Sequence, residues 1–275
     1  MTVRFIVPTL LWASDIHLDH LGASGRAALA GRLHTAAGDP LIVTGDLSTA
    51  THLVAELEFL ADAARRPLYF VLGNHDHYGS SVARIRDAVL ALGERRSDIQ
   101  WLPPAGVVPL NEQTALIGVD GWADGRSGDP LATPLVLNDD RLIGEIAALS
   151  GRAAKLAVKR ALADADATRL AVLLERAAAI ATAIVVATHV PPFAEVLPKS
   201  GRLAQPHWLP LLVCGATGEV LQRFAGEHPD HEFMVLCGHT HAEMDVHVQP
   251  NLRCMVMGAR YGEVGVREVG SSSRA

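Results

Sequence analysis

The sequence predicts an α/β fold in which buried strands alternate with amphipathic helices. Several short apolar runs each end at a polar or glycine-containing motif, and continuous apolar runs of this length are typical of strands covered on both faces. Between the early runs, apolar residues recur at helical spacing, as do Leu53, Leu57 and Leu60. This alternation favours a sheet whose strand ends gather polar residues in loops. The apolar runs are 10–13, 41–43, 68–72, 184–187 and 233–236.

Length and composition favour one large domain. Of the 275 residues 49% are apolar and 20% are charged, which allows a large core. We expect a single domain over residues 1–269 and a disordered tail over 270–275.

The alanine-rich segment 138–182 lacks proline and predicts an added set of helices. Asn138, Asp139 or Asp140 is expected to cap its first helix, and Asp164 or Asp166 a later one. The segment either packs on the sheet or forms a cap that shapes a substrate pocket. We favour packing, because alanine-rich helices are common packing elements.

Charge and cysteine content restrict the class of protein. A formal net charge of −6 argues against an extended nucleic-acid surface, although a short nucleic-acid end stays open as a substrate. The three cysteines, Cys214, Cys237 and Cys254, show no CxxC spacing, and we expect reduced core thiols in a cytoplasmic protein.

The N-terminal apolar run superficially imitates a signal peptide. Because it leads without a break into Asp15 and His17, we interpret it as a buried first strand. No apolar run reaches the roughly 20 residues that a membrane span needs, so no membrane partner is expected. The oligomeric state stays open.

Five polar motifs carry the candidate chemistry. Each is weak alone, but each follows an apolar run, so five loops would bring seven oxygen or nitrogen ligands to one sheet edge. Carboxylates, imidazoles and one amide suit divalent manganese, iron or zinc. Where two ligands lie two residues apart, extended backbone would point both the same way. The motifs are Asp15-Ile16-His17, Gly45-Asp46, Gly73-Asn74-His75-Asp76, His189 and Gly238-His239-Thr240-His241.

In order and spacing, these motifs resemble the calcineurin-like metallophosphoesterase superfamily, from Asp15 to His241. The resemblance implies a four-layer αββα sandwich with two divalent metal ions, manganese first and iron or zinc as alternatives. It also implies that a metal-bridging hydroxide attacks phosphorus in line, with His75 and Asp46 as the catalytic residues. One ion would be held by Asp15, His17 and His241, the other by Asn74, His189 and His239, and Asp46 would bridge them.

Departures in two of the motifs narrow the expected substrate. In phosphoprotein phosphatases of this superfamily, the second motif reads Gly-Asp-x-x-Asp-Arg-Gly and the third ends in Glu. Here Thr49 replaces the second Asp, no Arg follows, and Asp76 replaces the Glu. We therefore predict a hydrolase of a small phosphodiester or phosphomonoester, similar to the small bacterial phosphodiesterase-like branches. A nuclease acting on DNA or RNA ends and a catalytically silent metal-binding scaffold are the alternatives.

Further residues near the motifs either line the pocket or pack in the core. Trp122 stands in a loop between Gly121 and Gly125, and an exposed tryptophan there would need a ligand to cover it. The set is His20, His77, Tyr78, Trp122, Asp124 and Phe193.

Overall fold

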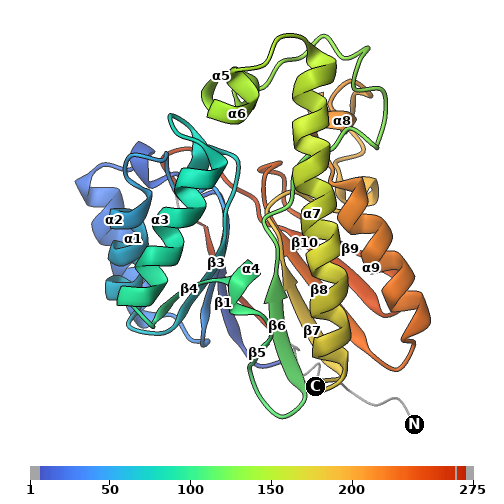
Figure 1. Ribbon diagram of the computed structural model, residues 1–275. Helices are drawn as coiled ribbons and strands as arrows, with labels where there is room; N and C mark the ends of the chain where they lie inside the picture. The colour runs from blue at the N-terminus through green and yellow to red at the C-terminus, as the bar shows by residue number, and fades with distance from the viewer. Residues whose placement is uncertain (1–6, 264, 271–275) are drawn as a thin grey trace.

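Two β-sheets face each other in the computed structural model, which describes residues 7–263 and 265–270. Helices α1, α2 and α3 cover the outer face of one sheet, and α7 and α9 cover the other (Figure 1). The first sheet has the order β11-β1-β2-β3-β4, and the second has the order β5-β6-β7-β8-β10-β9. The expected α/β fold with four αββα layers is confirmed.

Five of the described strands follow the predicted apolar runs, with each boundary shifted by at most one residue, and the other strands were not predicted. Strands of the first sheet are β1 (Leu10–Ala13), β2 (Leu41–Thr44), β3 (Leu68–Val71), β4 (Ile99–Trp101) and β11 (Val266–Val269). Those of the second are β5 (Val108–Pro109), β6 (Thr114–Gly118), β7 (Ala183–Ala187), β8 (Glu232–Cys237), β9 (Met244–Gln249) and β10 (Leu252–Val256).

Most helices are connections that pack against these strands. The α-helices are α1 (Ala23–Thr35), α2 (Leu53–Ala64), α3 (Val82–Arg95), α4 (Leu102–Ala105), α5 (Asp139–Leu142), α6 (Gly144–Ala147), α7 (Arg152–Ala178), α8 (Leu209–Leu212) and α9 (Gly215–Glu227). Short 3-10 turns are η1 (Leu18–His20), η2 (His75–His77), η3 (Ala194–Val196) and η4 (Arg202–Ala204).

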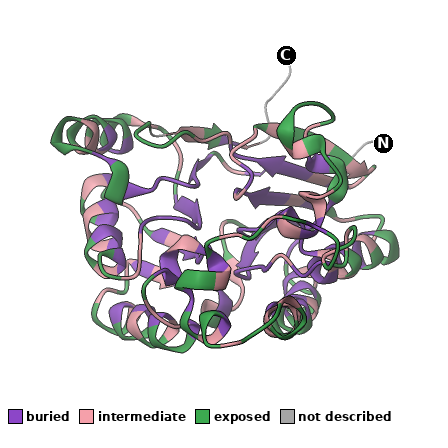
Figure 2. Ribbon diagram, turned by 90° about the horizontal axis from the view of Figure 1, so that it is seen from above, coloured by how far each residue is buried: buried purple, intermediate pink, exposed green. Residues whose placement is uncertain are grey.

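The first strand shows why the apolar runs are continuous. Leu10 and Trp12 belong to the core between the two sheets, whereas Leu11 and Ala13 belong to the core beneath α1 and α2. Alternate side chains of a strand point to opposite faces, so a strand covered on both faces needs apolar residues throughout. Seen from above, the strands form a largely buried band between exposed helices (Figure 2).

Parallel pairing brings the carboxyl ends of the central strands to one edge of each sheet. β1, β2, β3 and β4 run parallel, as do β6, β7, β8 and β10. These ends meet at the upper edge in Figure 1, where α5, α6 and the first turns of α7 also lie. The five polar motifs therefore gather beneath an added helical layer.

The segment 138–182 is mostly helical, as predicted, but its later cap is wrong. Asp164 and Asp166 lie inside the 27-residue helix α7, which begins at Arg152 after Gly151. Asp166 is buried and accepts a hydrogen bond from the backbone N–H of Gly121 (2.9 Å), so this carboxylate fixes a loop. At the first helix, Asn138 is the N-cap residue, but its side chain makes no cap hydrogen bond.

Three further expectations concern the core and the ends of the chain. All three cysteines are free and buried, which confirms the expected core thiols. Within the described residues, no helix is both long and apolar enough to cross a membrane. The tail predicted over 270–275 lies outside the described residues, except for Gly270, and the single-domain boundary at 269 stays a prediction.

Candidate metal centre

Every predicted ligand follows a strand, but the backbone there is not extended. Asp15 and His17 have φ values of 50° and 44°, and His239 and His241 have values of 70° and 58°. The expectation that extended backbone aligns each pair is therefore wrong. In these two motifs, left-handed backbone at both ligand positions sets the directions of the two side chains.

Such backbone is strained. Left-handed φ values in non-glycine residues cost of order 1–3 kcal/mol each and persist only where the surroundings hold them. Asp46 shares this conformation, with φ of 53°. Among the described residues, six non-glycine residues have a positive φ, and Arg65 alone of them is not a predicted ligand. The strain is thus concentrated at the candidate site.

Two glycines allow the motif loops to approach closely. Gly45 has φ of 83°, and a Cβ there would lie 2.6 Å from Nδ1 of His189. A Cβ at Gly73 would lie 2.2 Å from Oδ1 of Asp46. Both positions exclude any larger residue, because a Cβ at either glycine would clash with atoms of a neighbouring motif.

Asp76 ties the same two loops together. Its carboxylate accepts backbone N–H groups of Gly73 (2.8 Å), Asp46 (3.1 Å), Leu47 (2.9 Å) and Ser48 (3.1 Å). Complete burial, followed by the charge of Asp46, nevertheless raises the pKa of Asp76 to about 8. Asp76 holds the loops in place and does not enter the site.

One group of predicted ligands lies on the β1 side of the site. Asp15, His17, Asp46 and His241 each offer an atom within 4.8 Å of the others, and such a group can hold a metal ion. Nε2 of His241 lies 3.3 Å from Oδ1 of Asp15 and 3.3 Å from Nε2 of His17. Burial, followed by the nearby His75, lowers the pKa of His17 to about 3, so this ring is neutral.

A second group meets on the β7 side. Nδ1 of His189 lies 2.8 Å from the backbone oxygen of Thr44, which can only accept, so Nδ1 carries the hydrogen. Likewise Nε2 of His239 donates to the backbone oxygen of Leu211 (3.0 Å). Burial lowers the pKa of both rings, which keeps them neutral. Each histidine therefore turns a bare nitrogen lone pair inwards.

These lone pairs meet an oxygen rather than a donor. Oδ1 of Asn74 lies 3.1 Å from Nε2 of His189 and 3.1 Å from Nδ1 of His239. The amide is fixed in this direction because its Nδ2 donates to Tyr78 Oη (2.9 Å) and Asp139 Oδ1 (2.8 Å). Hydrogen-bond acceptors that face one another repel each other. These three atoms are therefore suited to bind a cation between them.

Asp46 lies between the two groups. Its Oδ1 is 3.4 Å from Nε2 of His189, and its Oδ2 is 3.8 Å from Nε2 of His17. Burial, followed by the negative charge of Asp15, raises the pKa of Asp46 well above its ordinary value. Without a positive charge nearby, the ionised carboxylate is therefore unfavourable.

His75 lies beside Asp46 at the open side of the cluster. Its backbone N–H donates to Oδ1 of Asp46 (2.9 Å), and its Nε2 lies 3.9 Å from Oδ2 of the same residue. Its ring packs against Tyr78, with centroids 4.3 Å apart, and its side chain is 22% exposed. The structure thus brings all seven predicted ligands and His75 together, while their individual roles stay predictions.

Asp139 was considered only as a helix cap, yet it contacts this site. Its Oδ1 accepts hydrogen bonds from Asn74 and from Tyr78 Oη (2.7 Å). Burial lowers the pKa of His75, and the charge of Asp139 is the largest opposing influence. Asp139 is therefore an acidic group near His75. The pair Asp139-Asp140 at the start of a helical segment was the sequence signal.

Six residues were predicted either to line the pocket or to pack in the core, and four of them pack in the core. Trp122 is 3% exposed within an apolar cluster, so it packs in the core and needs no ligand to cover it. Phe193 lies in the core beneath α7 and α9, His77 is fully buried beside Trp122, and Asp124 accepts N–H groups at the start of α9. Tyr78 contacts the site.

The remaining residue, His20, lies at the rim of the site. A second residue at this rim, Tyr261, is aromatic and was not indicated by the motifs. Tyr261 is 53% exposed, and its ring centroid lies 4.5 Å from that of His17, 4.8 Å from that of His20 and 5.3 Å from that of His241. It lies in the loop after β10, outside all five motifs, so sequence spacing gave no signal for it.

Converging lone pairs at the carboxyl edge of a two-sheet α/β sandwich place the protein among metal-dependent hydrolases. The chain belongs to the calcineurin-like phosphoesterase family, which matches residues 8–243. The protein is therefore a metal-dependent phosphoesterase, and its donor cluster supports binding of a divalent metal. None of the curated proteins matches the sequence significantly.

Solved structures share the fold at low sequence identity. The phosphopantetheinyl hydrolase PptH from Mycobacterium tuberculosis aligns with a TM-score of 0.65 and 17% identity, over 96% of each chain. A dimetal phosphatase from Danio rerio aligns with a TM-score of 0.55 and 11% identity, over 91% of this chain and 88% of that one. A putative 5'-nucleotidase from Staphylococcus aureus gives 0.51 and 15%, over 94% of this chain and 50% of that one.

Proposed function

We propose that the protein hydrolyses a small phosphodiester or phosphomonoester at a centre for two divalent ions. The observation that carries this proposal is the position of Asp46, whose two carboxylate oxygens face separate groups of lone pairs. Manganese is the expected ion, with iron or zinc as alternatives. One ion would be held by Asp15, His17 and His241, the other by Asn74, His189 and His239, with Asp46 shared.

The chain's own contribution to the reaction is orientation and proton transfer. Bound divalent ions would supply a water of lowered pKa and stabilise charge on the transferring phosphate. His75, packed on Tyr78 and partly exposed, is placed to hydrogen-bond the phosphate or protonate the leaving group. Asp139 holds Asn74 and Tyr78, and through Tyr78 it orients His75.

A small ester is favoured over a nucleic acid. Two of the similar structures are named for hydrolysis of a phosphopantetheinyl group and of a nucleotide, both small phosphate esters. The net charge of −6 opposes the backbone contacts by which proteins bind nucleic acids. We therefore place DNA and RNA ends behind small esters as substrates.

Metal removal and replacement test this function. Protein stripped with a chelator should be inactive on bis-p-nitrophenyl phosphate and p-nitrophenyl phosphate, and added Mn²⁺ should restore hydrolysis. Calorimetric titration should show two ions bound per chain. Inactivity on both compounds with manganese, iron and zinc would overturn the proposal. Bound metal without hydrolysis of either compound would instead indicate a metal-binding scaffold. Salt-sensitive cleavage at DNA ends would indicate a nuclease.

Removing Asp139 should weaken metal binding although Asp139 is not a proposed ligand. In Asp139→Ala, Asn74 loses the acceptor that fixes its amide, and loss of a partner behind a ligand commonly lowers metal affinity about 10- to 100-fold. Titration with Mn²⁺ measures this change. Asp87→Ala, at an exposed position of α3, is the matched control and should bind manganese like the wild type. Unchanged affinity in Asp139→Ala would refute the positioning role.

A further inference from the structure

The candidate metal centre is open to solvent beside the loop that follows β10. The side chain of His189 is completely buried, whereas those of His75 and His241 are 22% and 24% exposed. A substrate would therefore reach bound ions over His75 and His241. Residues that line this opening lie next to whatever groups the ester carries besides its phosphate.

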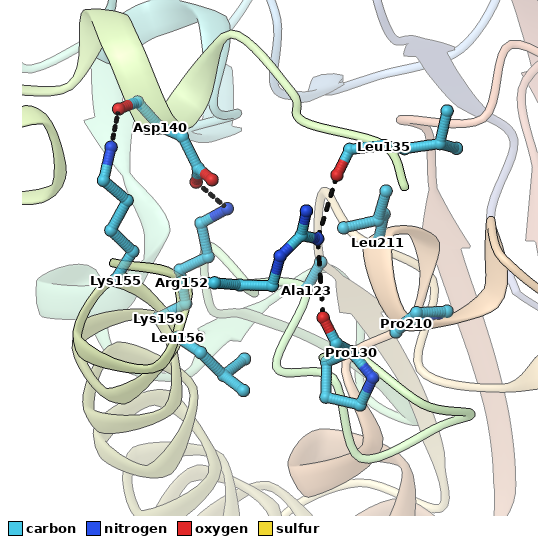
Figure 3. Close-up of a pocket in the computed structure, with 10 residues that line it drawn as sticks. All are labelled: Ala123, Pro130, Leu135, Asp140, Arg152, Lys155, Leu156, Lys159, Pro210 and Leu211. Atoms are coloured by element: carbon cyan, nitrogen blue, oxygen red, sulfur yellow. Dashed lines mark hydrogen bonds and ion pairs between the residues drawn. The ribbon is translucent and has the colours of Figure 1, made fainter. Parts of the chain in front are cut away.

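The sides of the centre that face α5, α7 and α8 are closed by hydrogen bonds. Asp139 of α5 accepts from Asn74, and the backbone oxygen of Leu211 in α8 accepts from His239. Beyond these contacts, the cations at the start of α7 are bonded to Asp140 and to backbone oxygens of the preceding loop (Figure 3). We therefore expect the part of a substrate that projects from the centre to lie on the open side.

Tyr261 lies at this opening, in contact with two proposed ligands. Its ring centroid is 4.5 Å from that of His17 and 5.3 Å from that of His241. The ring of His20 lies against the same phenol, with centroids 4.8 Å apart, and the side chain of His20 is 52% exposed. The two rings form an aromatic wall at the edge of the centre, and both are half-exposed.

The backbone holds Tyr261 in a fixed place relative to the ligand His241. The N–H of Ala259 donates to the backbone oxygen of His241 (3.2 Å), and the N–H of Glu263 donates to that of Arg260 (3.0 Å). Tyr261 is thus part of a tight turn that is tied to the last of the five motifs. Its hydroxyl group makes no hydrogen bond within the described part of the chain, so the ring contacts alone hold the side chain.

Packing accounts for only part of this aromatic ring. Single exposed aromatic residues are common on protein surfaces, and an aliphatic side chain would cover His17 as well. Tyr261, however, leaves 53% of its surface exposed directly beside proposed ligands. Aromatic surface gains free energy when a planar ring stacks on it and removes it from water. A substrate bound at the centre can provide such a ring.

We propose that Tyr261, supported by His20, determines specificity by stacking on a planar aromatic ring of the substrate. The inference rests on the proposed function and narrows its substrate class to small phosphate esters that carry an aromatic or heteroaromatic ring. Stacking accepts many such rings, because each of them has a π-face. An ester with only aliphatic groups leaves Tyr261 uncovered and binds more weakly.

Two phosphonates that differ by one ring system test the inference. They are the analogues of adenosine 5'-monophosphate and of ribose 5-phosphate in which a methylene group replaces the ester oxygen, so that neither is hydrolysed. Calorimetric titration of the manganese-loaded wild type should show tighter binding of the adenosine compound. In Tyr261→Leu, this preference should fall about 5- to 150-fold, the range measured for stacking of one base on an aromatic side chain.

The matched control is Tyr261→Phe, which keeps the ring and removes only the hydroxyl group. It should show the wild-type preference, and both variants should bind the ribose compound like the wild type. Equal losses with both compounds in Tyr261→Leu would show that Tyr261 only supports the metal centre. Loss of the preference in Tyr261→Phe would assign it to the hydroxyl group. Either result would overturn the inference.

The binding measurement also separates this inference from the proposed function. Inactivity of the wild type on both p-nitrophenyl compounds would defeat the proposed function, whereas the preference between the two phosphonates would still decide the role of Tyr261. Undetectable binding of the adenosine compound, or equal affinity of the wild type for both compounds, would overturn the inference. A wild-type preference that persists in Tyr261→Leu would do the same.

Discussion

Replacing Asp46 by Asn should abolish activity, weaken the stabilisation by metal and stabilise the metal-free protein. The shared carboxylate is lost, so Mn²⁺ binding should weaken and kcat/KM on bis-p-nitrophenyl phosphate should fall about 10³-fold or more, since metal stabilisation of phosphoryl transfer amounts to several kcal/mol. In the metal-free protein, the same substitution should raise stability. Burial and the charge of Asp15 raise the pKa of Asp46, so the neutral amide removes an unfavourable charge.

Thermal unfolding with and without Mn²⁺ measures the stability of the wild type and of the variant. A group with a raised folded pKa binds its proton more tightly when folded, so the contribution of Asp46 to the stability of the metal-free protein should fall as the pH rises above about 4, the ordinary carboxyl value. At pH 7, metal-free Asp46→Asn should therefore melt above the metal-free wild type. Added Mn²⁺ should raise the melting temperature of the wild type far more than that of the variant. A manganese response equal to that of the wild type would show that Asp46 is no ligand.

Replacing His75 by Gln should slow the reaction while the metal stays bound. A positioned acid or base contributes about 10²- to 10⁴-fold to rate, so kcat should fall within that range. His75 faces the cluster from beside Asp46 and is not a proposed ligand, so metal content should match that of the wild type. Steady-state kinetics and metal analysis on the same preparation measure the two quantities.

The matched control is His34→Gln, at an exposed position of α1. It should retain wild-type kcat and metal content. Loss of metal in His75→Gln would assign His75 to the metal-binding residues, and unchanged kcat would exclude it from proton transfer. The backbone N–H of His75 bonds to Asp46 in either variant, so the loop itself should stay intact.

Much of the site could be predicted because its signals are local in the sequence. A strand buried on both faces must be apolar throughout, so the runs before Asp15, Asp46 and Asn74 were recognisable. Parallel strands end at one edge, which indicated that their loops would meet. The ordered motifs then identified the family, and the structure places the other six predicted ligands around Asp46.

Sequence spacing could not predict the backbone conformation within the motifs or the burial of residues outside them. Left-handed backbone at Asp15, His17 and Asp46 is held by surrounding contacts that no local pattern encodes. Trp122 is buried because helix α7 and its neighbours cover a loop that glycines alone would leave open.

By itself, the sequence determined the five strands that precede the motifs, the types of ligand residue and their order, since each depends on residues adjacent in the chain. Only the tertiary structure decided which distant residues support them. Asp139 reaches Asn74 across 65 positions, and Tyr261 comes to lie beside His17. These contacts form when the added helical layer and the loop after β10 pack against the strand ends, and packing between distant segments leaves no periodic trace in the sequence.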